Sequence, residues 1–265
     1  MSNFVCLSGL PRSGSTILSA ILDQNPLIHA EGNSAVCQLM WDMQRSGTVN
    51  AAEQLKGNNR EHTVHDILRA IPRIYYKDIA PTKKIVVDKC RAWTIGSNSD
   101  LLRRYIDPAI KIIVLERSIT AIMKSFLKLY QKNNWKPDYI NAVLNALLKP
   151  NGDPIMSSII GINMAKKKEA NETNPANRTF LFIQYDDLLA KPTETIQRIY
   201  DFCGWKPYTH DFQNIINTHP ENDEFYKLEG FHAIRSTLQK AENNVVLPPD
   251  IEAKCRQIDT LMGYI

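Results

Sequence analysis

The stretch from Phe4 to Gln24 limits the possible folds of this chain more than any other part of its sequence. A short apolar run, FVCLS, ends just before Gly9 and is typical of a buried parallel strand. Apolar residues then recur at helical spacing over residues 15–24. A strand, a glycine-containing loop and a helix in this order open the α/β folds that bind phosphate groups. The sequence therefore predicts an α/β protein with an anion site near its N-terminus.

Strands and helices continue to alternate along the chain. Clear strands are expected at 84–89, 110–117 and 179–185, and a shorter strand at 27–31. Helices are expected at 98–106, 118–130, 139–148, 155–170 and between Pro192 and Gly204, and residues 34–76 are mostly helical with breaks near Gly47, Gly57 and Pro72. This alternation favours a three-layer α/β fold, in which helices flank a mostly parallel central sheet of the P-loop-containing nucleotide-binding type.

The chain length and composition favour one ordered unit. We expect a single domain over residues 1–265, with helical insertions at about 34–80 and 131–170 and a C-terminal cap from about 217. The cap has weak periodicity and is expected to wrap over the ligand edge of the sheet. The net charge of +4 is too small to indicate a nucleic-acid-binding protein.

The cysteines and apolar runs bear on the compartment. There are five cysteines, an odd number, and no C-x-x-C pair, which favours a reduced protein. The N-terminus lacks the basic segment of a signal peptide, and no apolar run reaches the length of a membrane span. We therefore expect a cytoplasmic protein without a membrane span. The sequence does not indicate the oligomeric state.

The loop LSGLPRSGSTIL, residues 7–18, has the spacing of a phosphate-binding loop but lacks its lysine. The pattern G-x-x-x-x-G-K-[ST] is matched by Gly9, Gly14 and Thr16, whereas Ser15 stands at the lysine position. Backbone amides of such a loop cradle an anion at a helix N-terminus. This pattern indicates an anion site that does not depend on the usual lysine.

Other side chains of the loop supply donors in place of that lysine. Ser13, Ser15 and Thr16 carry hydroxyl groups, and the guanidinium of Arg12 can grip a sulfate or phosphate with two parallel hydrogen bonds. Ligands of open α/β sheets bind beyond the carboxyl ends of the strands. Charged or polar residues follow several of the expected strands at that edge: Glu31, Asp88, Lys89, Arg117, Tyr185, Asp186 and Asp187.

Three stretches resemble the sulfotransferases that use 3′-phosphoadenosine 5′-phosphosulfate (PAPS). LPRSGSTILSAILDQNP resembles their 5′-phosphosulfate loop, and VLERSITAIMKSF resembles their 3′-phosphate site, where Ser125 follows Arg117 by eight positions. FIQYDDLLAKPTETIQRIYDFCGW resembles the later strand and helix of the family. The resemblance spans roughly residues 4–206 and is closest to the tyrosylprotein sulfotransferases and their bacterial relatives.

This resemblance implies an enzyme that moves the sulfuryl group of PAPS to a hydroxyl acceptor by in-line displacement. The product would be 3′-phosphoadenosine 5′-phosphate (PAP), and no metal is expected. The residues that the resemblance assigns to the cofactor are Arg12, Ser13, Gly14, Ser15, Thr16, Arg117, Ser125, Tyr185 and Arg235. Tyr185 would lie near the adenine, although a tyrosine at a strand end is also common at a protein surface. Arg235 belongs to the segment EGFHAIRSTLQK, which resembles the family's late basic segment.

The resemblance also implies candidates for catalysis. Lys89 would stabilise the leaving group, with Arg12 sharing this role at the sulfate, and Glu31 would be the general base. His29 and His232 are alternatives for the base, because histidine often serves in that role. Lys89 is alternatively a strand-end lysine paired with its neighbour Asp88. Glu31 is alternatively a loop carboxylate or a partner of Arg12.

Two other functions remain open at this point. One is a Mg²⁺-dependent kinase of small molecules or nucleotides with a degenerate loop, in which Asp88 would hold the metal opposite Thr16. The other is a non-catalytic nucleotide-binding protein. His62 and His65 are spaced like a metal pair but more simply form a solvated helix face. The acceptor class stays open among small molecules, carbohydrates, lipids and peptides.

Overall fold

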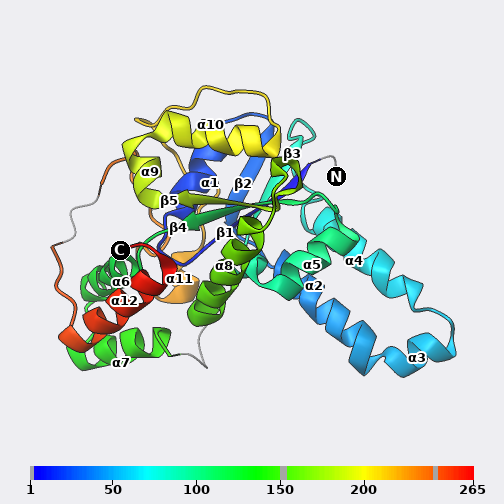
Figure 1. Ribbon diagram of the computed structural model, residues 1–265, viewed down its shortest axis with the longest axis horizontal. Helices are drawn as coiled ribbons and strands as arrows, with labels where there is room; N and C mark the ends of the chain where they lie inside the picture. Colours follow the sequence, from blue (N-terminus) through cyan, green and yellow to red (C-terminus); the bar gives the residue numbers. More distant parts are fainter. Residues whose placement is uncertain (1–2, 150–153, 241–243) are drawn as a thin grey trace.

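The protein folds around a five-stranded, all-parallel sheet with the strand order β2–β3–β1–β4–β5. The structure, a computed structural model, describes residues 3–149, 154–240 and 244–265 (Figure 1). The strands are β1 (Phe4–Gly9), β2 (Ile28–Asn33), β3 (Ile85–Lys89), β4 (Lys111–Glu116) and β5 (Phe180–Gln184). Strand order reverses on the two sides of β1, so the end of β1 is the switch point where ligands of such sheets bind.

Helices cover both faces of the sheet, so the expected three-layer α/β fold is confirmed. Successive residues of β1 point to opposite faces: Val5 and Leu7 enter one core, and Phe4 and Cys6 enter the other. The first core is covered by α1 (Ser15–Asp23), α9 (Tyr185–Ala190) and α10 (Pro192–Cys203). The second is covered mainly by α5 (Gly96–Tyr105), α6 (Ile119–Lys132) and α8 (Pro154–Ala170), and α7 (Pro137–Leu147) packs on α6 (Figure 1).

Residues 36–75 form a helical arm at one side of the sheet (Figure 1). It contains α2 (Val36–Arg45), a π-helical turn (Ser46–Asn50), α3 (Ala52–Gly57) and α4 (His62–Tyr75). The break expected near Pro72 is wrong, because Pro72 lies inside α4. Val64, Leu68 and Pro72 form one buried stripe of this helix. The free energy gained by burying that stripe outweighs the loss of the backbone hydrogen bond that the proline cannot donate.

A C-terminal helix, α12 (Pro249–Met262), was not foreseen from the sequence and supports α6. Asp259 of α12 is almost fully buried and caps the N-terminus of α6. Its carboxylate accepts hydrogen bonds from the amide of Ile119 and from both the amide and the hydroxyl of Thr120, the last two at 3.1 and 2.7 Å. Such a cap fixes the start of the helix that carries Ser125.

Between α10 and α12 the chain runs over the carboxyl edge of the sheet, and its described residues there form one short helix, α11 (Asp223–Tyr226). We call residues 217–239 the tail segment. Parts of two expected regions, residues 150–153 of the second insertion and 241–243 of the cap, lie outside the described residues. Among the described residues, none of the helices has the length and apolar character needed to cross a membrane.

Candidate active site

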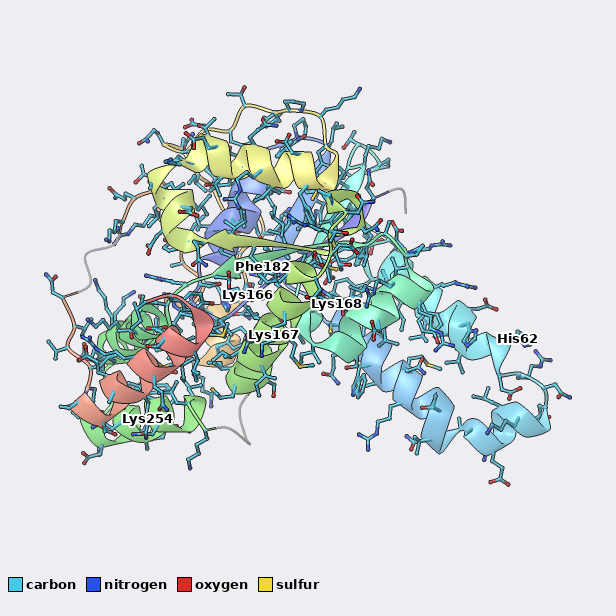
Figure 2. All side chains as sticks on the ribbon, in the orientation of Figure 1. His62, Lys166, Lys167, Lys168, Phe182 and Lys254 are labelled. Carbon is cyan, nitrogen blue, oxygen red and sulfur yellow. The ribbon has the colours of Figure 1, made fainter. Side chains whose placement is uncertain are left out.

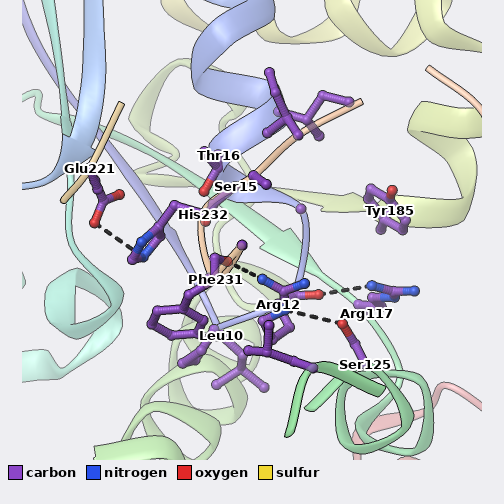
Figure 3. Close-up of a pocket in the computed structure, with 18 of the residues that line it drawn as sticks. Leu10, Arg12, Ser15, Thr16, Arg117, Ser125, Tyr185, Glu221, Phe231 and His232 are labelled. Carbon is purple, nitrogen blue, oxygen red and sulfur yellow. Dashed lines mark hydrogen bonds and ion pairs between the residues drawn. The ribbon is translucent and has the colours of Figure 1, made fainter. Parts of the chain in front are cut away.

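A cavity of about 570 Å³ opens at the carboxyl edge of the sheet. Residues at or just after the ends of all five strands line it: Gly9, Asn33, Lys89, Arg117 and Tyr185. The tail segment closes the opposite wall (Figure 3). Because parallel strands bring their carboxyl ends to one edge, the fold itself gathers these residues.

The loop between β1 and α1 forms the floor of the cavity. Gly14 adopts φ +99°, and a Cβ at this position would lie 2.4 Å from the ring of Tyr185. Glycine is therefore needed both for the backbone conformation and for the close approach of that ring. The first turn of α1 then presents Ser15, Thr16 and Ile17 to the cavity. Amides of a first helical turn lack intrahelical acceptors, so this end of α1 attracts an anion.

Two guanidinium groups meet in the cavity. Arg12 has φ +64°, and its Nε donates a hydrogen bond to Ser125 Oγ at 3.1 Å (Figure 3). Its Nη1 donates to the carbonyl oxygen of Phe231 in the tail segment. Arg117 Nη1 donates to the carbonyl oxygen of Arg12 at 2.9 Å, and its guanidinium lies 4.7 Å from the ring centre of Tyr185.

Burial affects both of these cations. It lowers the pKa of Arg12, with a further lowering from neighbouring Arg117, and it also lowers the pKa of Arg117. Both side chains nevertheless stay protonated near neutral pH. Two desolvated positive charges beside a helix N-terminus make this part of the cavity complementary to a multiply charged anion.

Acidic residues of the tail segment face these cations from the opposite wall. Glu221 Oε1 accepts hydrogen bonds from Lys89 Nζ at 2.9 Å and from the amide of Asn33 at 3.1 Å. Glu221 Oε2 lies 3.2 Å from His232 Nε2 (Figure 3). The Nδ1 of that histidine lies 2.7 Å from Asp223 Oδ1. The Lys89 ammonium also lies 3.5 Å from Thr16 Oγ1. A carboxylate–imidazole–carboxylate chain thus lies beside a lysine at the rim of the anion floor.

Asp88 lies outside this group although it precedes Lys89 in the chain. It is fully buried on the other face of β3. Its carboxylate accepts hydrogen bonds from Ser34 Oγ, Tyr76 Oη and Trp93 Nε1 at 2.5, 2.8 and 2.6 Å. Burial raises the pKa of Asp88 above its usual range, although these hydrogen bonds oppose the shift. The ammonium of Lys89 is therefore paired with Glu221 and not with Asp88.

Most residues assigned from the sequence lie together in this cavity. Those that line it are Arg12, Gly14, Ser15, Thr16, Lys89, Arg117, Ser125, Tyr185 and Arg235, together with His232. They come from six separate parts of the chain. The roles given to them stay predictions, but their common location is the arrangement that those roles require.

The structure does not bring Ser13, His29 and Glu31 to the cavity wall. Ser13 is fully buried, its amide donates to the carbonyl oxygen of Leu10 at 3.1 Å, and its hydroxyl faces the interior. This tight turn directs the side chain away from the anion floor. Glu31 Oε2 lies 3.1 Å from His29 Nε2, so the carboxylate is directed back along β2 instead of toward Arg12.

Glu221 and Asp223 were missed from the sequence. They lie in the stretch HPENDEF, where the helical and strand periodicities fade. The usable signal was a concentration of acidic residues in a region already expected to cover the ligand edge. The glycine at position 32 is a second feature of the sequence with this explanation. The structure shows that a Cβ there would lie 2.3 Å from Glu221 Cγ.

Comparisons with known proteins agree with this geometry. A model of the "Sulfotransferase family" matches residues 5–210, which is most of the chain. No curated protein matches the chain significantly. Among solved structures, the sulfotransferase domain of the Synechococcus PCC 7002 olefin synthase is 20% identical, with 99% of this chain and 95% of that chain covered and a TM-score of 0.56.

Two further structures share the fold at lower identity. The sulfotransferase domain from the curacin biosynthetic pathway is 16% identical, covers 100% of this chain and 98% of its own, and has a TM-score of 0.52. Mouse sulfotransferase SULT7A1, solved in complex with PAP, is 12% identical, with 99% and 85% covered and a TM-score of 0.54. The family match, joined to a lysine-free anion loop at the switch point of a parallel sheet, shows that this chain belongs to the sulfotransferase family.

Proposed function

We propose that the protein transfers the sulfuryl group of PAPS to a hydroxyl acceptor by in-line displacement. One observation carries the proposal: the loop from Arg12 to Thr16 and the pair Arg117–Ser125 line the same cavity, although more than 100 residues separate them in sequence. A donor with phosphate groups on the 3′ and 5′ positions of one ribose needs two anion subsites within a single cavity. The PAP complex of mouse SULT7A1, which shares the fold, supports the same choice of nucleotide.

The floor of the cavity would hold the 5′-phosphosulfate. The free amides of the first turn of α1, the hydroxyls of Ser15 and Thr16 and the guanidinium of Arg12 would donate to its oxygens. Arg117 and Ser125 would hold the 3′-phosphate, with Arg235 of the tail segment close to the same region. Tyr185, already packed against Gly14 and Arg117, would offer a ring face to the adenine.

Lys89 would stabilise the charge that builds on the leaving phosphate oxygen. Its ammonium lies 3.5 Å from Thr16 Oγ1, at the rim of the anion floor. In-line displacement separates charge along the line of transfer, so a fixed cation at the leaving side lowers the barrier. Arg12 would share this role from the side of the sulfate.

His232 is the general base that the geometry supports best. It lines the cavity, and Asp223 at 2.7 Å from Nδ1 holds the ring so that Nε2 faces Glu221 and the rim. A carboxylate on one ring nitrogen fixes the tautomer and supports proton uptake at the other. To take a proton, Nε2 would have to leave Glu221 Oε2 at 3.2 Å, just as Glu31, the base expected from the resemblance, would have to leave His29. His232 is preferred because it lines the cavity and Glu31 does not.

The kinase alternative loses the residue that the sequence assigned to its metal, Asp88. It needs an acidic residue that faces Thr16 and can hold Mg²⁺, and Asp88 is fully buried with three hydrogen-bond donors around it. The acceptor class and a cytoplasmic location remain predictions.

Ligand-dependent melting tests the nucleotide. PAP is expected to raise the melting temperature without Mg²⁺, and AMP, which lacks the 3′-phosphate, is expected to do so much less. Stabilisation by ATP that requires Mg²⁺ would instead support a kinase.

Incubation with PAPS and a panel of hydroxyl compounds then tests the reaction, with the PAP and the sulfated product detected by mass spectrometry. We expect PAP to form together with a sulfate ester. Tight PAP binding without any transfer across aliphatic, aromatic and sugar hydroxyls would favour the non-catalytic alternative.

A further inference from the structure

A second cluster of polar side chains includes one residue of the tail segment and lies outside the lining of the cavity. It joins Asp23 at the end of α1, His29 on β2 and His219 of the tail segment. One possible ligand atom from each of these residues lies within 4.8 Å of the others. Two imidazoles and a carboxylate form a donor set that divalent transition metals favour. We propose that these residues form a binding site for a Zn²⁺-like ion.

The three ligand atoms lie within 4.8 Å of one another and must come closer together to bind one ion. His219 Nε2 lies 3.6 Å from Asp23 Oδ2. Ligand atoms of a tetrahedral zinc site are about 3.4 Å apart, which follows from bonds of about 2.1 Å. The side chains of Asp23 and His29 are largely buried, whereas that of His219 is 38% exposed. The ion can therefore enter from solvent at His219, the most exposed of the three ligands.

Groups around the cluster support the ligands. Glu31 Oε2 lies 3.1 Å from His29 Nε2, where it can either orient the ring for coordination through Nδ1 or bind the ion beside Nε2. Thr218 Oγ1 donates to Asp23 Oδ2 at 2.7 Å, and the amide of Ala30 donates to Asp23 Oδ1 at 3.2 Å. These contacts fix the carboxylate and leave one lone pair on Oδ2 for a metal. The contact with His29 assigns Glu31 to this cluster and not to the cavity.

One cation opposes the ion. Lys83 Nζ lies 3.2 Å from Asp23 Oδ1, the oxygen farther from His219, and also donates to the carbonyl oxygen of Ile28. The carboxylates of Asp23 and Glu31 outweigh its single charge. Because the set contains two nitrogen donors, it favours Zn²⁺, Co²⁺ or Ni²⁺ over Mg²⁺ and Ca²⁺, which prefer oxygen ligands.

The ion would act on the structure and take no part in sulfuryl transfer. His219 precedes Glu221 by two residues, and Glu221 holds Lys89 and His232 at the cavity. A metal bound to His219 therefore ties the acidic wall of the cavity to β2 and α1. This inference does not rest on the proposed function, and its test uses no sulfuryl donor.

The test titrates the untagged chain, stripped with EDTA, with Co²⁺ and then Zn²⁺. The wild-type chain is expected to show the visible absorption of four- or five-coordinate Co²⁺ and to lose this absorption when Zn²⁺ displaces Co²⁺. Zn²⁺ is also expected to raise its melting temperature. His219→Asn should lose the absorption and weaken Zn²⁺ binding by at least about tenfold, since removal of a supporting group alone has that effect. Glu31→Gln is the second variant and should weaken Zn²⁺ binding by about 10- to 100-fold.

Two matched variants locate the ion. His62→Asn removes an exposed histidine of the helical arm (Figure 2). His232→Asn removes the histidine of the cavity, and both variants should keep the Co²⁺ absorption. Absence of this absorption in wild type would overturn the proposal. So would a spectrum that survives both His219→Asn and Glu31→Gln, or one that disappears only in His232→Asn or His62→Asn.

Discussion

The two walls of the cavity are built in different ways. The cationic wall consists of the loop after β1 and the start of α6, where backbone hydrogen bonds and buried apolar residues fix the chain. The acidic wall is the tail segment, which contains one short helix and is held by side chains such as Glu221 and Asp223. Regular elements therefore place the cations, and a few polar contacts place the groups that face them.

This difference implies that the two walls respond differently to substitution. Changes in the cationic wall should alter ligand affinity or rate and leave the fold intact. Changes in the acidic wall should alter the fold of the tail segment as well, because its anchors are also its functional groups. The following predictions test this contrast, in order of decreasing effect.

The largest effect is expected at Lys89, where the two walls meet. Lys89→Met should lower the turnover number for sulfuryl transfer by about 10²- to 10³-fold, because the leaving oxygen loses its cation. The rise in melting temperature produced by PAP should persist. Lys89→Arg is the control and should recover part of the rate. Steady-state rates of PAP formation from PAPS measure both, and an unchanged rate in Lys89→Met would remove the leaving-group role.

Glu221 tests whether the acidic wall depends on single side chains. Glu221→Gln should lower the free energy of unfolding by about 3 kcal/mol, because it leaves the largely buried Lys89 without its counter-charge. Glu229, in the same segment, is an exposed ion-pair partner of Lys132. Glu229→Gln should therefore change the free energy of unfolding by about 0.5 kcal/mol or less. Urea denaturation compares the two, and equal losses would contradict the anchoring role.

Arg117 tests the cationic wall alone. Arg117→Ala should weaken PAP binding by about 10- to 100-fold, the loss expected for a charge-assisted hydrogen bond, and should leave AMP binding almost unchanged. The ratio of the two dissociation constants, measured by calorimetry, isolates the 3′-phosphate. Arg104→Ala, on the exposed side of α5, is the matched control. A parallel loss of PAP and AMP affinity would place Arg117 elsewhere on the nucleotide.

Asp259 tests how far the regular wall depends on the C-terminal helix. Asp259→Ala should lower the free energy of unfolding by about 1 to 2 kcal/mol, because the first amides of α6 lose their cap. Asp250→Ala in the first turn of α12, an exposed site, should stay within about 0.5 kcal/mol. Chemical denaturation measures both, and similar values would show that the cap contributes little.

The same contrast explains how much could be predicted from the sequence. Arg12 was predictable from the pattern of the loop after the first strand, and Arg117 and Ser125 from the resemblance of the strand–helix stretch that carries them. Glu221 and Asp223 were not, because their positions depend on how an irregular segment crosses the sheet edge. No local pattern encodes that path.

Other differences between the sequence prediction and the structure have local causes. Ser13 belongs to a loop rich in donors, but the turn from Leu10 directs its hydroxyl inward. The pairing of β2 with β3 shifts between Ala30 and Asn33, so position in the sequence was a poor guide to where Glu31 points. Helix α12 had recognisable ends, with Pro249 at its start and Gly263 after it, yet its weak periodicity hid it.

The contacts of Arg12 have a consequence for how strongly any anion can bind beside it. Its guanidinium donates to the carbonyl oxygen of Phe231 and to the hydroxyl of Ser125. An anion that uses those donors must replace these two partners, so its net gain at Arg12 is the difference between the old contacts and the new ones. The affinity of this cation for an anion is therefore expected to be lower than its charge and burial alone suggest.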